Sequence, residues 1–398
     1  MIYAMLIIPA AAAVISLIVR WNFLRRMILV LASCSHTVFV SAAWMKKPEP
    51  MLNGWLMPDR PGLLFLTITS VLFLACSFYA VGYLSGESKR KKRDFEEGLL
   101  FTNAPEAIFC ACLLVFLSTM TLVTVSQHLG LLWVAMEATT LASAPLIYFH
   151  RHHRSLEATW KYLLICSVGI ALALLGNFFM VIAASEPSVL DKSIVLSNLL
   201  RQAHHLNVPW LKAAFLFYLV GYGTKMGLAP LHTWLPDAHS ESPSVISALL
   251  SGALLNCAFL GILRNFQICM AAGLSEFCRE LLILFGLVSM GWAAVFIFGQ
   301  TDYKRMLAYS SVEHVGIMAL GIGIGASAAF GSMLHAVNHS LTKAMLFLAA
   351  GNILAVYKTK TTAGVSGVLK TIPLTGMLWI AGFLAITGVP PLDRKSVV

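Results

Sequence analysis

Twelve long apolar stretches, joined by short polar connections, constrain this 398-residue chain more than any other feature of its sequence. A helix that crosses a bilayer needs about 20 mostly apolar residues. Only 12% of the residues are charged, against about 25% in soluble globular chains, which excludes a soluble enzyme, and the high hydrophobicity excludes a disordered chain. The sequence therefore predicts an all-α polytopic membrane protein with about twelve transmembrane helices, at residues 2–19, 27–45, 62–84, 105–125, 128–149, 159–184, 211–231, 243–263, 281–299, 306–324, 328–356 and 372–391.

The basic residues between these stretches predict the orientation of the chain. Cytoplasmic loops carry an excess of Lys and Arg, and the count favours an N-terminus outside. The run from Lys89 to Arg93 dominates the comparison and anchors the cytoplasmic side. The net charge of +10 is spread among the loops, which favours contact with an anionic lipid leaflet over binding of nucleic acid.

The sequence predicts neither a cofactor nor a metal in this chain. Its eight cysteines lie mostly in apolar stretches, where cysteine behaves as a small hydrophobic residue. Cys110 and Cys112 form the one close pair, which by itself is weak evidence for a metal site. No catalytic nucleophile motif, phosphate loop, dinucleotide fingerprint or iron–sulfur spacing appears in the sequence, so we expect no catalytic residue.

Ionisable residues inside the predicted helices carry most of the functional information. A charge at the bilayer centre costs about 3 kcal/mol or more, so it normally faces the protein interior or a wet cavity. Glu137 lies near the middle of its stretch, where burial and a nearby cation would act on its proton in opposite directions. We expect it to load and release protons. The alternative is a structural carboxylate that is satisfied by the hydroxyls of Thr139, Thr140 and Ser143.

Lys225 lies in a glycine-rich segment that ends at Pro230. Proline cannot donate the backbone N–H that continues a helix, so we expect a break there. Broken helices at membrane depth occur only against protein or water, and transporters build ion sites from them. We expect Lys225 to face such a site; the alternative is a lysine that extends to the membrane surface.

His335, His339 and Lys343 follow one another at intervals of four residues and share one helix face. Successive members lie about 6 Å apart along the axis, and one water can bridge each gap. Histidine titrates near neutrality, so this spacing favours a proton relay; structural hydrogen bonds and a metal site are the alternatives. Glu313 and His314 are further candidates, either for the relay or as a helix cap.

Longer motifs surround these residues. They are Trp133-x-x-Met136-Glu137-Ala138, the stretch from Lys225 to His239, and the stretch from Asp302 to Ser311. Together with the His335 helix, they resemble the antiporter-like proton-pumping subunits of respiratory complex I, Mrp antiporters and group 4 hydrogenases. The Lys225–His239 stretch is highly specific and adds His232 and Asp237 as site candidates. The details around Glu313 and Asn256 are most similar to the F-type membrane component of hydrogenase-4.

The resemblance implies a fold of about fourteen helices with two inverted five-helix repeats, each holding one broken helix. Here the breaks are expected in the seventh helix, near Pro230, and in the twelfth, near Gly388. The implied organisation is a three-helix segment (1–104), a first repeat (105–263) and a second, incomplete repeat (281–398). Relatives continue past the Pro390-Pro391 pair with further helices, so the sequence is expected to be C-terminally truncated.

The resemblance also implies a mechanism. Glu137 would pair with Lys225, and a change in the charge of that pair would move protons along a hydrated axis through the His335 helix. Electron transfer in partner subunits, among them hydrophilic redox subunits, would drive this transport across the cytoplasmic membrane of a prokaryote. Many relatives have a lysine where this chain has Asn256, so the link between half-channels is expected to run through water or Ser251.

The leading hypothesis is therefore a proton-translocating, non-redox membrane subunit of a hydrogenase-4-like oxidoreductase complex, related to NADH-quinone oxidoreductase. The alternatives are a stand-alone cation/proton antiporter and a membrane scaffold that does not pump. No mid-membrane cluster of carboxylates in the sequence indicates sodium, so we expect protons to be the coupling ion.

Overall fold

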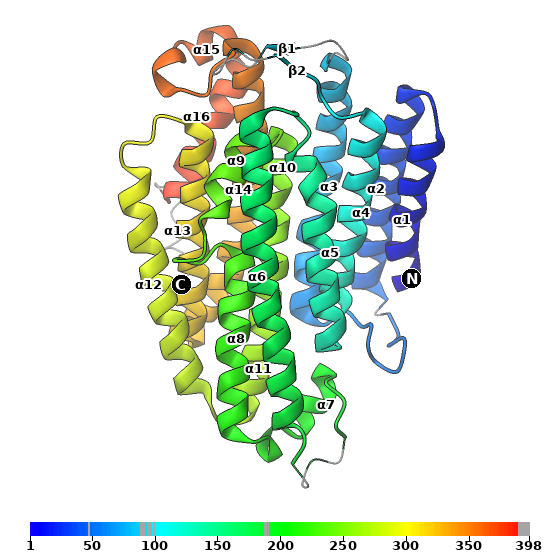
Figure 1. Ribbon diagram of the computed structural model, residues 1–398, viewed down its shortest axis with the longest axis vertical. Coiled ribbons are helices and arrows are strands. Elements are labelled where there is room, and N and C mark those ends of the chain that lie inside the picture. Colours follow the sequence, from blue (N-terminus) through cyan, green and yellow to red (C-terminus); the bar gives the residue numbers. More distant parts are fainter. Residues whose placement is uncertain are drawn as a thin grey trace.

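The computed structural model of the chain describes residues 1–46, 48–87, 92–93, 98, 100–186, 189 and 191–388. Most of this part is a bundle of helices that run along the long axis of the molecule (Figure 1). The two-residue strands β1 (Lys92–Arg93) and β2 (Leu100–Phe101) pair at one end of the bundle. The long helices are α1 (Ile2–Ile18), α2 (Asn22–Met45), α3 (Arg60–Gly86), α4 (Glu106–Val125), α5 (Leu129–Ile147), α6 (His153–Ala183), α8 (Val208–Met226), α11 (Leu255–Ala271), α12 (Ser275–Ile297), α13 (Tyr303–Ile324), α14 (Ala326–Tyr357) and α16 (Pro373–Thr387). The short elements are α7 (Leu196–Arg201), η1 (Ala203–His205), α9 (Trp234–Glu241), α10 (Ser244–Leu249), η2 (Leu250–Leu254), η3 (Thr362–Gly364) and α15 (Val368–Thr371).

Each of the twelve predicted stretches overlaps helical segments of the described residues, with 243–263 spanning α10, η2 and α11, and the prediction of an all-α polytopic membrane protein is confirmed. Among the described residues, nine helices are long and apolar enough to cross a membrane, and α1 and α16 are shorter apolar helices. Helix α6 begins at His153, earlier than predicted, because His152 and Ser155 form a capping box ahead of the apolar stretch. The fourteen-helix count, the inverted repeats and the domain boundaries remain predictions.

The predicted break in the seventh long helix, α8, is confirmed. The helix ends at Met226, and Gly227 follows in the left-handed conformation (φ +89°), which glycine adopts without strain. The freed backbone groups find side-chain partners: the indole N–H of Trp234 donates to the carbonyl of Thr224 (2.8 Å), and the hydroxyl of Ser289 accepts from the N–H of Ala229 (2.9 Å). At the second predicted break, near Gly388, α16 ends at Thr387 and Gly388 is in the left-handed conformation (φ +71°). The rest of that predicted break, from residue 389 on, lies outside the described residues, as do Lys89–Lys91 of the basic run.

The helical segment from Ser244 to Ala271 passes through the middle of the bundle, where its apolar core is completely buried. It is not a regular α-helix throughout, because Leu250–Leu254 form one π turn, a feature that often marks functional sites. Gly252 allows α14 to approach this turn, since a Cβ atom there would lie 3.0 Å from the carbonyl oxygen of Ser340.

A buried arginine of α11 joins the ends of two other helices. The guanidinium of Arg264 is fully buried and donates to the carbonyls of Val123, Thr124 and Ser126 at the end of α4, at 2.6–3.0 Å. It also donates to Asp59 (2.8 Å), the residue that caps α3. The carbonyl groups at a helix end have no partner within their own helix, so Arg264 satisfies them in the buried interior.

We predict that Arg264→Met lowers the free energy of unfolding by about 3 kcal/mol, because it leaves the Asp59 carboxylate and three carbonyls without their donor. Arg60 is an exposed arginine at the start of α3, and Arg60→Gln is expected to change stability by less than about 0.5 kcal/mol. Chemical unfolding of the two variants in detergent measures the difference. Equal stability of both variants would contradict this role for Arg264.

Candidate functional site

Lys225 lies in the last turn of α8, where a helix C-terminus favours a cation. Its side chain is fully buried. The ammonium group donates to the hydroxyls of Thr140 on α5 (2.8 Å) and Tyr162 on α6 (2.6 Å), and lies 4.5 Å from the centre of the Tyr162 ring. The alternative of a lysine reaching the membrane surface is therefore wrong.

Glu137 lies on α5, one turn before Thr140. One carboxylate oxygen accepts from the hydroxyl of Ser167 on α6 (2.8 Å), and the other is buried without a partner among the described residues. The expected pairing with Lys225 is not a direct contact in this structure, since no ion pair joins the two within the described part of the chain. They are neighbours within one polar cluster, defined here as the first cluster: Glu137, Thr140, Ser143, Tyr162, Ser167 and Lys225.

The hydroxyls that the structural alternative assigned to Glu137 have other partners. Thr139 donates to the carbonyl of Met136 (2.6 Å), Thr140 accepts from Lys225, and Ser143 bonds to the hydroxyl of Tyr162 (2.6 Å). The alternative is therefore wrong in naming these three hydroxyls as the partners of Glu137. Sequence reasoning missed Tyr162 and Ser167 of α6, because isolated hydroxyl residues in an apolar helix do not indicate which of them face a buried charge.

A second cluster lies between α13 and α14. His335, His339 and Lys343 are buried on α14, as their spacing predicts. His314 on α13 joins them: its Nδ1 lies 3.1 Å from Nε2 of His335, and its ring centre lies 5.5 Å from that of His339. Glu313 is half-buried beside this group and acts electrostatically on Lys343. We define the second cluster as Glu313, His314, His335, His339 and Lys343.

The π turn of the central helix reaches the second cluster. Ser251 bonds to Ser311 (2.9 Å), and Ser311 donates to the carbonyl of Leu307 (3.1 Å), which also accepts from the ammonium of Lys343 (2.8 Å). The side-chain amide of Asn256 donates to Ser340 (2.7 Å). Ser251 therefore connects the central helix to α13 beside the second cluster; its role in a link between half-channels stays a prediction.

His239 was not among the predicted site residues, although it ends the most specific motif. It is fully buried on α9 and stacks on Phe347 of α14 with ring centres 5.0 Å apart. It lies within electrostatic range of Lys304 and Lys343. The sequence did contain a signal for His239: it is a histidine that follows a predicted helix break in a membrane chain.

Two other candidates lie apart from both clusters. His232 packs against the rings of Trp292 and Tyr309. Asp237 forms ion pairs with Lys161 (2.9 Å) and Arg305 (2.8 Å) near the surface, so it joins α9 to α6 and α13.

No group of three His, Cys, Asp or Glu side chains within the described ranges could hold a metal ion.

Comparisons with known proteins agree with this architecture. Residues 126–394 match the family model described as NADH:quinone oxidoreductase/Mrp antiporter, transmembrane. The chain is 37% identical to a hydrogenase-4 component F homolog of Methylacidiphilum infernorum, over 90% of this chain and 74% of the relative. It is 28% identical to hydrogenase-4 component B of Escherichia coli, over 90% of this chain but only 52% of that protein.

The fold is also similar to a solved structure. A chain of the membrane-bound sulfane sulfur reductase, an archaeal respiratory membrane complex, superposes with a TM-score of 0.87 at 21% identity. The match covers 98% of this chain and 78% of that one. It supports the fold independently of the sequence motifs.

We predict that Tyr162→Phe lowers the free energy of unfolding by about 1–3 kcal/mol, because the buried ammonium of Lys225 loses one of its two acceptors. Tyr222 is the matched control. It is equally buried, but its hydroxyl has no partner among the described residues, so Tyr222→Phe is expected to be neutral. Thermal unfolding in detergent compares the two; equal losses would mean that the Lys225 contact contributes nothing.

Proposed function

Because the chain belongs to the NADH:quinone oxidoreductase/Mrp antiporter membrane family, we propose that it translocates protons as a membrane subunit of a hydrogenase-4-like, complex I-related assembly. It is a multi-pass membrane protein, and its homologues include membrane subunits of hydrogenase-4. The observation that carries the proposal is the first cluster, in which a buried lysine is held by neutral hydroxyls near a half-buried glutamate, one of whose carboxylate oxygens is buried. Such intramembrane ionisable residues mark proton pathways.

The first cluster can act as an electrostatic switch. Between opposite charges in a low-dielectric interior, attraction is much stronger than in water. Protonation of Glu137 removes the negative charge that favours the ammonium form of Lys225, so Lys225 then releases its proton more readily. Thr140 and Tyr162 can relay that proton, since a hydroxyl can accept it while donating its own hydrogen to the next acceptor, which for Tyr162 is the hydroxyl of Ser143.

The proton would then cross to the second cluster. His239 and Ser251 of the π turn lie beside the second cluster, and no hydrogen bond between side chains of the described residues joins the two clusters. Transient water would have to complete the path, and Lys343, His339 and the His335–His314 pair would carry the proton onward. We propose the residues of both clusters, with His239, as the translocation site.

The energy would come from other proteins of the complex. We propose that further membrane proteins flank this chain and that hydrophilic redox proteins drive it, while the chain itself carries neither cofactor nor metal. The similarity to hydrogenase-4 components supports this reading over a stand-alone antiporter. We further propose the cytoplasmic membrane of a prokaryote as its location, with the N-terminus outside.

We predict that Lys225→Ala and Glu137→Gln each abolish redox-driven proton uptake by vesicles that contain the assembled complex. Lys212→Ala on the same helix and Glu157→Gln at the exposed end of α6 are the matched controls, and both should retain uptake. The change of pH inside the vesicles is the measurement, and the protein composition of the complex is checked to confirm assembly.

Two results would contradict the proposal. Normal uptake by assembled Lys225→Ala would indicate a scaffold whose channel is not used. Proton movement that needs a sodium gradient but no electron donor would indicate a stand-alone cation/proton antiporter.

The orientation has its own test. Lys192 follows α6 and Lys370 lies on α15; both are exposed, and α7 and α15 mark opposite ends of the bundle (Figure 1). In intact cells, a membrane-impermeant thiol reagent is expected to label Lys192→Cys and to spare Lys370→Cys. The reverse labelling would place the N-terminus inside.

A further inference from the structure

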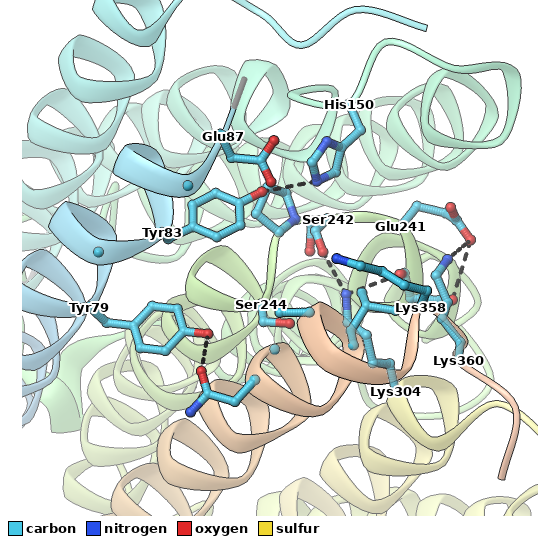
Figure 2. Close-up of a pocket in the computed structure, with 18 of the residues that line it drawn as sticks. Tyr79, Tyr83, Glu87, His150, Glu241, Ser242, Ser244, Lys304, Lys358 and Lys360 are labelled. Carbon is cyan, nitrogen blue, oxygen red and sulfur yellow. Dashed lines mark hydrogen bonds and ion pairs between the residues drawn. The ribbon is translucent and has the colours of Figure 1, made fainter. Parts of the chain in front are cut away.

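A cavity of about 610 Å³ lies outside both clusters, at the end of the bundle that holds β2 and the end of α14. Its volume falls in the range of small-molecule pockets, about 300–1,000 Å³. Figure 2 shows Tyr79 and Tyr83 of α3 on one side and three lysines, Lys304, Lys358 and Lys360, on the other. The proposed transport mechanism uses none of these residues.

Lys304 is the unusual member of this cavity. Its side chain is 1% exposed, and its ammonium donates to the carbonyls of Ser240 (3.1 Å) and Ser242 (2.6 Å). No carboxylate contacts this ammonium among the described residues, and Asp302 and Glu241 act on it electrostatically without contact. Lysine has three N–H donors, so one remains after these two bonds. A buried cation without a paired anion is costly, and an anion in the cavity would offset that cost.

The charged groups of the lining are predominantly basic. Lys360 pairs with Glu241 (2.9 Å), and Glu241 also lies 3.7 Å from His152. Burial raises the pKa of the Glu241 carboxyl, but Lys360, Arg154 and Lys304 together hold that pKa below its usual value, so Glu241 is ionised. Glu87 accepts from the side-chain amide of Asn103 (2.5 Å). Among the described residues, the lining therefore holds three lysines and two glutamates, so basic side chains predominate there.

The remaining walls of the cavity are apolar, and on this side the cavity opens to the outer surface of the bundle. Phe78 of α3 is 58% exposed at the rim, and Leu354 and Ala355 of α14 line the facing side. Gly82 also lines the cavity, and a Cβ atom added there would meet nothing within 4 Å. The cavity is therefore polar and basic at one end and apolar where it meets the outer surface of two membrane helices. That combination suits an amphiphile.

We propose that this cavity binds the phosphodiester head group of an anionic phospholipid, with its phosphate toward Lys304 and its glycerol and first acyl carbons between α3 and α14. Basic pockets between membrane helices on the cytoplasmic side bind anionic head groups in this way. Inorganic phosphate offers the same oxygen atoms but leaves the apolar wall uncovered. The proposal does not depend on proton transport by the two clusters.

The test is native mass spectrometry of the full chain, released from micelles that contain either phosphatidylglycerol or phosphatidylcholine. We expect phosphatidylglycerol to be retained at least about fivefold more, the order expected for one basic residue that attracts an anionic lipid. Gly82→Leu fills the cavity without a clash and should abolish this preference. Lys304→Gln keeps a donor for the Ser242 carbonyl but removes the charge, and it should reduce retention by a similar factor.

Two variants serve as controls. Gly291→Leu adds the same side chain at another open helix position, on α12, and Lys370→Gln removes an exposed charge on α15; both should retain lipid as the native chain does. Equal retention of the two lipids, or full retention by Gly82→Leu, would overturn the proposal. So would displacement of phosphatidylglycerol by inorganic phosphate that binds the lipid-free chain and requires Lys304, because the ligand would then be free phosphate.

Discussion

The structure depends on one constraint: inside a bilayer, every polar group must find its partner within the protein. A continuous helix satisfies this constraint for its own backbone N–H and C=O groups. The places where a helix stops show how the protein satisfies the groups that are left over. Where α8 stops at Met226, the indole of Trp234 and the hydroxyl of Ser289 take the freed backbone groups. Where α4 stops, Arg264 does so from another helix. Each of these irregularities in the backbone is matched by a side chain placed to satisfy it.

The buried cations show how the same constraint separates structural from functional roles. Arg264 faces carbonyls and a carboxylate, so its charge is permanently balanced and its guanidinium joins the ends of α3 and α4 to α11. Lys225 faces only hydroxyls, and its carboxylate neighbour Glu137 is not in contact. A balanced charge stabilises one arrangement. A charge that is only partly compensated responds when a nearby group gains or loses a proton.

The sequence could predict the helices and the position of Lys225, because both follow from local composition: apolar length for the helices, and glycine with Pro230 for the break. It could also place His335, His339 and Lys343 on one face, since helical spacing is a local property. It could not predict contacts between helices. Tyr162, Ser167 and the Ser251–Ser311 bond depend on which faces meet, and the π turn that contains Ser251 lies where α14 packs closely against Gly252.

The choice between hydroxyl and carbonyl partners also gives direction to a proton path. A carbonyl can hold an ammonium group but cannot take its proton, whereas a hydroxyl can accept one proton and donate another. Lys225 is held by two hydroxyls, so its proton has an outlet within the first cluster. Lys343 is held by the carbonyl of Leu307, so a proton that leaves it needs an acceptor elsewhere, such as another group of the second cluster or water. The chemistry of the partners, more than the spacing of the charged residues, therefore decides where a proton can move in this bundle.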